Sequence, residues 1–330
     1  MNAEPLSEQL GVAIENLVAP LAASAALAVE VRQGGQVIYN GTFGRDTVGA
    51  PVRTDTLFDL GALTELFTLT AFLRLVDTGR LWIDTPVSIV LEGFDEKTTF
   101  YQLLTHSAGL PETFDLSRYR DYDARVSALL RLKPHPAADH ATRYSPLDFI
   151  LIGFALEILL DLPLAQAVAM MVLQPLDLRA QFIPLGEAIP MVGRPDRDVA
   201  DRSARDLDSV AGHAGLFGTA SDLGTLATLF LEGGVLGSAE LLSETISGEA
   251  TRQHHGTMGL GWNQTFANPS DGFGYTAATG SFVRVDGLRD LVITLLVGSS
   301  TETSAIPDAL RGLPDMLLAT VQRLTDSATE

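Results

Sequence analysis

Thr56-Leu-Phe-Asp-Leu-Gly-Ala-Leu-Thr-Glu-Leu-Phe67 leads into a long apolar stretch that ends in Leu73-Arg-Leu-Val-Asp-Thr-Gly-Arg-Leu81. Apolar side chains recur along it at three- and four-residue intervals, as on one face of an α-helix: Leu66, Leu69, Leu73 and Val76. Gly79 suits the position just past a helix end, where the backbone turns left-handed. The spacing predicts a helix over 63–78.

Strand-like segments lie toward both ends of the chain. Residues 25–31 and 36–43 alternate like strands around Gly34 and Gly35, which predicts a hairpin. Further strands are predicted over 259–266, 279–285 and 291–297, and a closing helix over 306–324. Between residue 80 and about 195 the pattern indicates helices and irregular connections. This arrangement predicts an α/β (α+β) fold, in which an antiparallel sheet is flanked by helices with a helical insertion region.

The predicted organisation is a single domain over 1–330. Its α/β body takes up approximately 1–80 and 210–330, and a mostly helical region takes up approximately 81–209. Within that region Ser145-Pro146-Leu147-Asp148 is typical of a helix start. Ser145 suits the N-cap, Pro146 the first helical position, and Asp148 the place of a capping-box acid.

Bulk composition limits the function classes. Of the 330 residues, 46% are hydrophobic and 19% charged, as in a globular protein. The net charge of −19 disfavours nucleic acid and anionic membranes as partners. The absence of cysteine excludes disulfides, thiolate chemistry and zinc–thiolate sites. The first residues lack the pattern of a secretory signal, so a cytoplasmic location is expected unless a leader was removed.

Six further segments carry a family signal. They are Asp84-Thr-Pro86, Leu103-Leu-Thr-His-Ser-Ala-Gly-Leu-Pro111, Arg143-Tyr-Ser145, Val210-Ala-Gly-His-Ala-Gly-Leu-Phe-Gly-Thr-Ala-Ser-Asp-Leu223, Gly259-Leu-Gly-Trp262 and Phe273-Gly-Tyr-Thr-Ala-Ala-Thr-Gly280. With the opening stretch, they resemble the serine β-lactamase and penicillin-binding-protein family, including class C β-lactamases and related esterases. They follow the family's order from about residue 25 to 300. The resemblance implies a β-lactamase/transpeptidase-like fold.

The resemblance also implies acyl transfer at a serine. In the family, the serine opens an S-x-x-K motif at a helix start, a Y-x-N motif adds a tyrosine, and a K-T-G or H-T-G strand lines the opposite wall. In this chain the nucleophile position is Ala62 and the lysine position is Glu65. The Y-x-N position is Tyr144-Ser145-Pro146, which keeps the tyrosine, and the strand motif is Tyr275-Thr276-Ala277.

Each departure from the family motifs has a physical consequence. Ala62 has no side-chain oxygen, so no acyl-enzyme can form there. Glu65 replaces a cation with an anion, which reverses the field that would lower the pKa of Tyr144. Pro146 offers no side-chain amide to a substrate carbonyl. Tyr275 removes a positive charge that would face a substrate carboxylate.

The leading hypothesis is a member of this family that has lost serine acyl transfer and binds a small carbonyl- or carboxylate-bearing ligand, or a protein partner. Backbone N–H groups at Ala62 and Ala278 do not depend on side chains, so an oxyanion-like pair of donors is expected to remain. No cofactor is expected. The predicted ligand-binding residues are Ala62, Glu65, Tyr144, Tyr275, Thr276, Ala277 and Ala278.

Two alternatives stay open. The first is a residual or altered hydrolase of the esterase, β-lactamase or peptidase type, with Tyr144 and Glu65 as candidate catalytic residues beside the backbone donors. The second is a structural or interaction module whose pocket is filled by side chains such as Tyr275. For Glu65 the other interpretation is a solvated or capped carboxylate near a helix N-terminus, where the helix dipole favours an anion.

Histidines give no metal signal. His254 and His255 are adjacent and point apart, without a nearby acid cluster, so they predict surface positions and no metal site. His213, in a glycine-rich turn, is interpreted as a structural residue that bonds backbone groups beneath the pocket.

Overall fold

The computed structural model describes residues 5–23, 25–135, 142–182, 191–194, 198–263, 271–298 and 312–329. Within these ranges the largest sheet has five antiparallel strands in the order β2-β1-β11-β10-β9. Their bounds are β1 (Ala26–Gln33), β2 (Gln36–Phe43), β9 (Gly272–Thr276), β10 (Phe282–Asp286) and β11 (Leu291–Gly298).

The predicted hairpin between β1 and β2 is confirmed. Gly34 and Gly35 connect the strands with φ values of 55° and 69°, and this left-handed pair matches the right-handed twist of a hairpin. On its other side β1 pairs with β11, from Ala26 opposite Gly298 to Gln33 opposite Leu291. The two ends of the chain therefore meet at the centre of one sheet.

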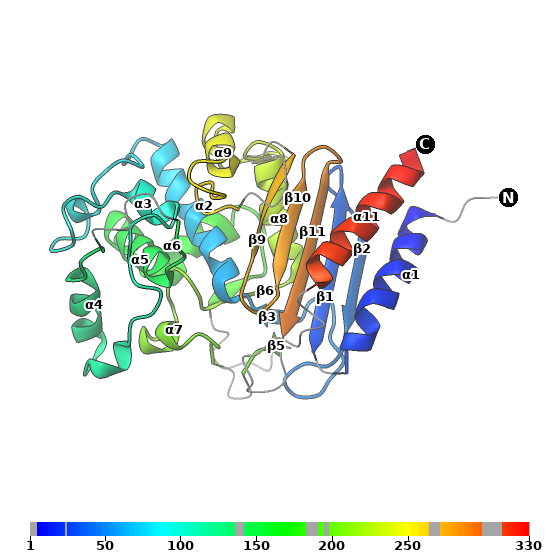
Figure 1. The fold of residues 1–330 in the computed structure, drawn as a ribbon, viewed down its shortest axis with the longest axis horizontal. Helices are drawn as coiled ribbons and strands as arrows, with labels where there is room; N and C mark the ends of the chain where they lie inside the picture. Colours follow the sequence, from blue (N-terminus) through cyan, green and yellow to red (C-terminus); the bar gives the residue numbers. More distant parts are fainter. Residues whose placement is uncertain are drawn as a thin grey trace.

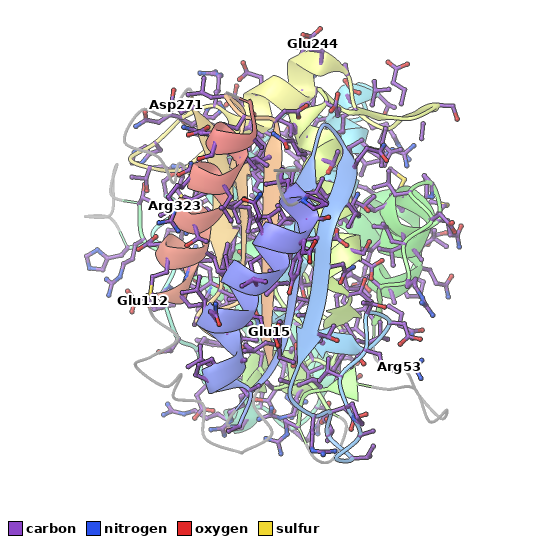
Figure 2. The ribbon with its side chains drawn as sticks, turned by 90° about the vertical axis from the view of Figure 1, so that its right-hand side faces the viewer. Glu15, Arg53, Glu112, Glu244, Asp271 and Arg323 are labelled. Carbon is purple, nitrogen blue, oxygen red and sulfur yellow. The ribbon has the colours of Figure 1, made fainter. Side chains whose placement is uncertain are left out.

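Helices cover both faces of this sheet. Helices α1 (Leu6–Val18) and α11 (Leu313–Thr329) lie side by side on one face (Figures 1 and 2). Their apolar stripes bury against the alternate residues of β1 and β11 that point toward them. Helix α8 (Ala220–Leu231) packs on the opposite face, against β1, β10 and β11. Both faces are thus buried, so β11 is apolar at nearly every position.

The helix predicted over 63–78 is confirmed as α2 (Thr64–Asp77), with Gly79 following at a φ of 70°. Nearly every residue of α2 is buried, where the sequence pattern indicated one apolar stripe. The reason is its place between layers, since α5, α6 and a π-helical turn (Ala169–Leu173) pack around it (Figure 1). A helix surrounded in this way has no solvent face to keep polar.

The remaining helices are mostly short. They are α3 (Phe100–Leu104), α4 (Tyr122–Leu130), α5 (Pro146–Leu160), α6 (Leu164–Val168), α7 (Arg202–Asp206) and α9 (Glu244–Thr251). Two small sheets accompany them, β4 (Gln181–Phe182) with β6 (Leu216–Gly218), β3 (Leu57–Asp59) and β5 (Met191–Val192), and β7 (Val235–Leu236) with β8 (Ala239–Glu240). Strand β3 ends just before Gly61, so this sheet holds the start of α2 in place.

The predicted fold class is confirmed, and two local predictions are wrong. Residues 259–263 form tight turns, with Asn263 bridging to Gly274, while 264–266 lie outside the described residues. Ser145 does cap α5, but Asp148 completes no capping box, because its carboxylate bonds His106 instead. Across the described ranges, no helix combines the length and apolarity needed to cross a membrane.

Candidate functional site

The candidate site lies where β9 meets the first turn of α2, and the end of β3 positions that turn. Asp59 at the end of β3 accepts a hydrogen bond from the N–H of Gly61, which adopts a φ of 50°. This turn opens a 3-10 segment (Gly61–Leu63) that continues into α2 and leaves Ala62 partly exposed. Three residues on, one helical turn places Glu65 on the inner side of the helix, with 0% of its surface exposed.

Two tyrosines donate to the buried carboxylate of Glu65. Tyr144, just before α5, donates its hydroxyl to Oε1 at 3.0 Å. Tyr275 in β9 donates to Oε2 at 2.7 Å. Tyr275 is itself only 4% exposed, whereas Tyr144 is 44% exposed and presents one side of its ring to the outside. Glu65 is therefore enclosed by the two hydroxyls that bond it.

A buried histidine completes the cluster. His106 has a left-handed backbone (φ 49°), and its imidazole Nδ1 lies 2.7 Å from Oδ2 of Asp148. Its Nε2 lies 3.6 Å from Oε2 of Glu65, longer than a hydrogen bond. The Tyr144 ring stands over the imidazole at a centroid distance of 5.0 Å. His106 thus lies between two carboxylates, both almost fully buried.

The electrostatics of this cluster follow from burial and its fixed charges. Burial alone would lower the pKa of His106, but Asp148 and Glu65 outweigh it and raise that pKa to about 10. Burial raises the pKa of Asp148 to about 6, against the opposing pull of His106. At neutral pH the imidazolium therefore sits between anionic partners.

Both tyrosines are neutral under the same conditions. Burial and the Glu65 carboxylate hold the pKa of Tyr144 well above its usual range, and the pKa of Tyr275 is raised for the same two reasons. Each hydroxyl is thus a donor to Glu65. Neither has the lowered pKa that a tyrosine base needs at neutral pH.

The outer edge of β9 presents hydrogen-bond donors. Gly274 exchanges both backbone bonds with Asn263 on that edge, and strand alternation turns the N–H and C=O of Thr276 the same way. Thr276 and Ala278 are exposed. Among the described residues, no acceptor engages the backbone N–H of Ala62 or of Ala278. Within the described ranges, the two predicted backbone donors are therefore unpaired.

Sequence reasoning missed Arg284, a cation behind the strand motif, whose side chain lies on the α11 side of the sheet, opposite the face that carries Tyr275. It lies in β10 opposite Gly274, and its Nη2 donates to Oγ1 of Thr276 at 2.7 Å. Its Nη1 also reaches the carbonyl of Tyr275 at 3.3 Å. Only the pairing of strands 272–276 and 282–286 could have indicated Arg284, because it places residue 284 beside the strand motif.

The structure therefore brings together Ala62, Glu65, Tyr144 and Tyr275. It places Thr276 and Ala278 on the exposed edge, while Ala277 is buried. The alternative of a solvated Glu65 is wrong, since the carboxylate has no exposed surface. His106, the neighbour of Glu65, and Asp148, which bonds His106, were also missed, although His106 lies inside a segment that carried the family resemblance.

His213, His254 and His255 bond partners outside this cluster. His213 is buried, and its Nε2 lies 2.9 Å from Oδ1 of Asp201. The prediction that this histidine bonds backbone groups is therefore wrong. Asp201 is the better partner because it also caps α7 and holds a fixed position. His254 and His255 bond the carbonyl of Glu249 and the hydroxyl of Thr142. No cluster suited to a metal ion occurs in the part of the chain that the structure describes.

Comparison with known proteins identifies the family. The family described as Beta-lactamase matches residues 14–313. The chain belongs to the beta-lactamase family. A relative from Salmonella typhimurium strain LT2 is named "Putative D-alanyl-D-alanine carboxypeptidase" and is 26% identical over an alignment of 314 residues. The match covers 77% of this chain and 72% of the relative. The family consists of hydrolases of the carboxypeptidase, β-lactamase and esterase types.

Solved structures share the fold of this beta-lactamase-family chain. SurE superposes with a TM-score of 0.75 at 23% identity, covering 97% of this chain and 76% of SurE. EstCE1, described as a hydrolase with promiscuous acyltransferase activity, gives 0.73 at 18% identity, over 96% and 98% of the two chains. A class C beta-lactamase from Rhodobacter sphaeroides gives 0.69 at 19%, over 96% and 99%. At these identities the likeness concerns the fold alone.

Proposed function

We propose that this chain has lost the serine acyl transfer of its family and binds a small ligand that carries a carbonyl and a carboxylate group. The observation that carries the proposal is the enclosure of Glu65. The residue at the lysine position is an anion with no exposed surface, bonded by Tyr144 and Tyr275. It cannot reach a substrate or a water molecule without the loss of both bonds.

Chemistry at the neighbouring positions supports the same conclusion. Ala62 supplies no oxygen to attack a carbonyl. Tyr144 is exposed enough to touch a ligand, but its raised pKa keeps the proton on the hydroxyl at neutral pH. An activated nucleophile and its base act as a unit, and the loss of such a unit typically lowers kcat by about 10⁶-fold.

The ligand class follows from the exposed donors. The N–H groups of Ala62 and Ala278, which have no acceptor within the described ranges, suit a carbonyl or carboxylate oxygen. Thr276 adds an exposed hydroxyl, and Arg284 bonds it from the α11 side of the sheet, so a positive charge lies behind the strand edge. The Glu65 anion is enclosed and faces the His106 imidazolium, so it does not repel a bound carboxylate strongly.

The test uses N-acetyl-D-alanyl-D-alanine, chosen because the Salmonella relative is named for that chemistry, and a chromogenic cephalosporin. Binding is followed by calorimetry, release of D-alanine by chromatography, and covalent adducts by intact-protein mass spectrometry. We expect saturable binding of the dipeptide with neither adduct nor product. Turnover that disappears in Tyr144→Phe would support the residual-hydrolase alternative and overturn the proposal. Silence in every assay would favour the interaction module.

A further inference from the structure

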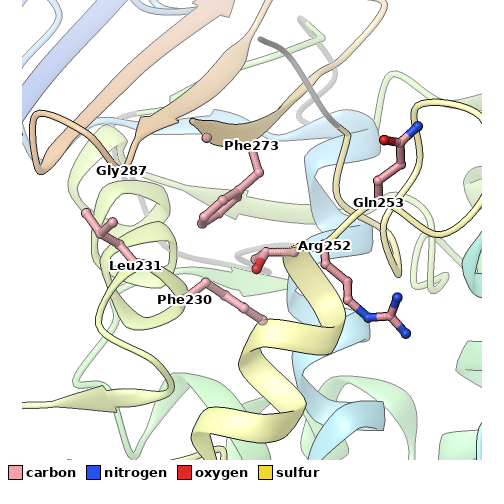
Figure 3. A pocket seen from close by; sticks show the side chains of 8 residues that line it. Phe230, Leu231, Arg252, Gln253, Phe273 and Gly287 are labelled. Atoms are coloured by element: carbon pink, nitrogen blue, oxygen red, sulfur yellow. The ribbon is translucent and has the colours of Figure 1, made fainter. Parts of the chain in front are cut away.

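A cavity lies at the other end of β9 from the candidate site. It has a volume of about 410 Å³ and opens where β9 begins and β10 ends, against the last turns of α8 and α9 (Figure 3). Gly272 at this cavity and Thr276 at the candidate site are four positions apart along β9, a distance of roughly 13 Å. The cavity is therefore a separate place on the molecule, and its size falls within the range of small-molecule sites.

Two of the eight residues that line this cavity are aromatic. Phe230 from α8 and Phe273 from β9 line it, with Leu231 beside them. In Figure 3 the two phenyl rings face the same space, while the polar ends of Arg252 and Gln253 point away from it. The Arg252 guanidinium is already engaged by both carboxylate oxygens of Glu249. No charge is thus directed at an occupant, so the site favours an uncharged molecule.

The side chain that packs against both phenyl rings carries a polar group with no partner in the described part of the chain. Trp262 is 0% exposed and packs edge-on against Phe230 and Phe273, with centroid distances of 5.2 and 4.9 Å. Its indole Nε1–H is buried and bonds no acceptor among the described residues. A buried donor left unpaired is unfavourable, and buried tryptophans usually find an acceptor. A ligand oxygen that reaches between the two phenyl rings would satisfy this donor.

We propose that this cavity binds a small uncharged aromatic molecule bearing one hydrogen-bond acceptor, such as a ketone or amide oxygen. The aromatic body packs on Phe230 and Phe273. The acceptor displaces the edge of the Phe273 ring and bonds the indole N–H of Trp262. This site is independent of the function proposed for the β9–α2 region.

The experiment uses acetophenone and the indole N–H resonance of Trp262 in ¹⁵N-labelled protein. The chain has two tryptophans, and Trp82→Phe removes the exposed one, which assigns the other signal. We expect a saturable downfield shift with half-saturation at roughly 1 mM. Ethylbenzene, which has the same shape without the oxygen, should cause a smaller shift.

Two glycine substitutions provide the matched pair. A Cβ at Gly287 would meet only the carbonyl of Asp271, at 3.6 Å, so Gly287→Leu fills the cavity without a backbone clash. Gly248 in α9 has open space around it, so Gly248→Leu makes the same change outside the cavity. Acetophenone should fail to shift the indole signal in Gly287→Leu and still shift it in Gly248→Leu.

The outcomes that overturn the proposal are distinct. No saturable shift up to the solubility limit, or an equal shift in Gly287→Leu, excludes binding at this cavity. An equal downfield shift with ethylbenzene excludes the acceptor bond to Trp262. If Gly287→Leu does not fold, intermolecular NOEs between acetophenone and the Leu231 methyl groups decide the matter in the unmodified protein, and their absence overturns the proposal.

Discussion

The hydroxyl of Tyr275 donates to Oε2 of Glu65 at 2.7 Å, joining the edge strand β9 to the first turn of α2 across 210 positions of sequence. By the family resemblance, a lysine is expected at position 65 and a lysine or histidine at position 275. Here an anion at one is matched by a neutral donor at the other. The two departures from the family motif therefore compensate each other. Tyr275 with a lysine at 65, or Glu65 with a phenylalanine at 275, would lose the bond.

Removal of each tyrosine hydroxyl should affect stability unequally. Tyr275→Phe deletes a short, buried bond to a charged acceptor and should lower the free energy of unfolding by about 2–3 kcal/mol. Tyr144→Phe deletes a longer bond from a partly exposed residue and should cost about 1 kcal/mol or less. Urea unfolding at pH 7 measures both. The reverse order would show that Tyr275 does not hold Glu65.

Stability should fall as the pH rises through the alkaline range. The pKa of His106 is raised to about 10 in the folded chain, above the value of about 6.5 for an unfolded histidine. The contribution of His106 to the free energy of unfolding is therefore complete below pH 6.5 and is lost as the pH rises through about 10. We expect the free energy of unfolding to fall by on the order of a few kcal/mol between pH 7 and 10.

Urea unfolding at several pH values measures how the free energy of unfolding depends on pH. In His106→Gln this dependence should be weaker. His255→Gln is the control, because that side chain bonds a hydroxyl outside the buried cluster. An NMR titration gives a direct readout, in which the imidazole of His106 stays protonated at pH 8. A midpoint near 6.5 would contradict the charged arrangement between Glu65 and Asp148.

Restoring the nucleophile alone should not restore acylation. Ala62→Ser adds a hydroxyl, but residue 65 remains an anion held by Tyr144 and Tyr275, and no group is placed to accept the serine proton. Mass spectrometry after incubation with a cephalosporin should show no adduct above background. A covalent adduct is expected only when Glu65→Lys and Tyr275→His accompany it. Efficient acylation of Ala62→Ser by itself would mean that Glu65 or Tyr144 serves as a base.

Arg284 should control the affinity for carboxylates. Arg284→Met removes the charge that bonds Thr276 from behind the strand edge and should weaken binding of N-acetyl-D-alanyl-D-alanine by roughly 3-fold, since this charge acts on the ligand carboxylate at a distance. Calorimetry measures the change. Arg120→Met, at an exposed position next to α4, is the matched control. Equal affinity in the two variants would remove Arg284 from the ligand site.

Much of the fold was predictable because its signals are local. Helical spacing identified α2, the paired glycines identified the β1–β2 hairpin, and Ser145 with Pro146 identified the start of α5. These features depend on neighbours within a few residues. Two predictions failed: the strand over 259–266 and the capping role of Asp148. In both places a group that was expected to bond locally bonds a partner farther along the chain.

For the candidate site, the sequence by itself determined which side chains are present: an alanine at 62, an acid at 65, and tyrosines at 144 and 275. Only the tertiary structure decided their state. Enclosure of Glu65 depends on β9 lying against α2, and the imidazolium of His106 depends on Asp148 arriving from α5. Burial and hydrogen bonding are set by groups far apart in the chain, and in a low-dielectric interior they fix charge and reactivity.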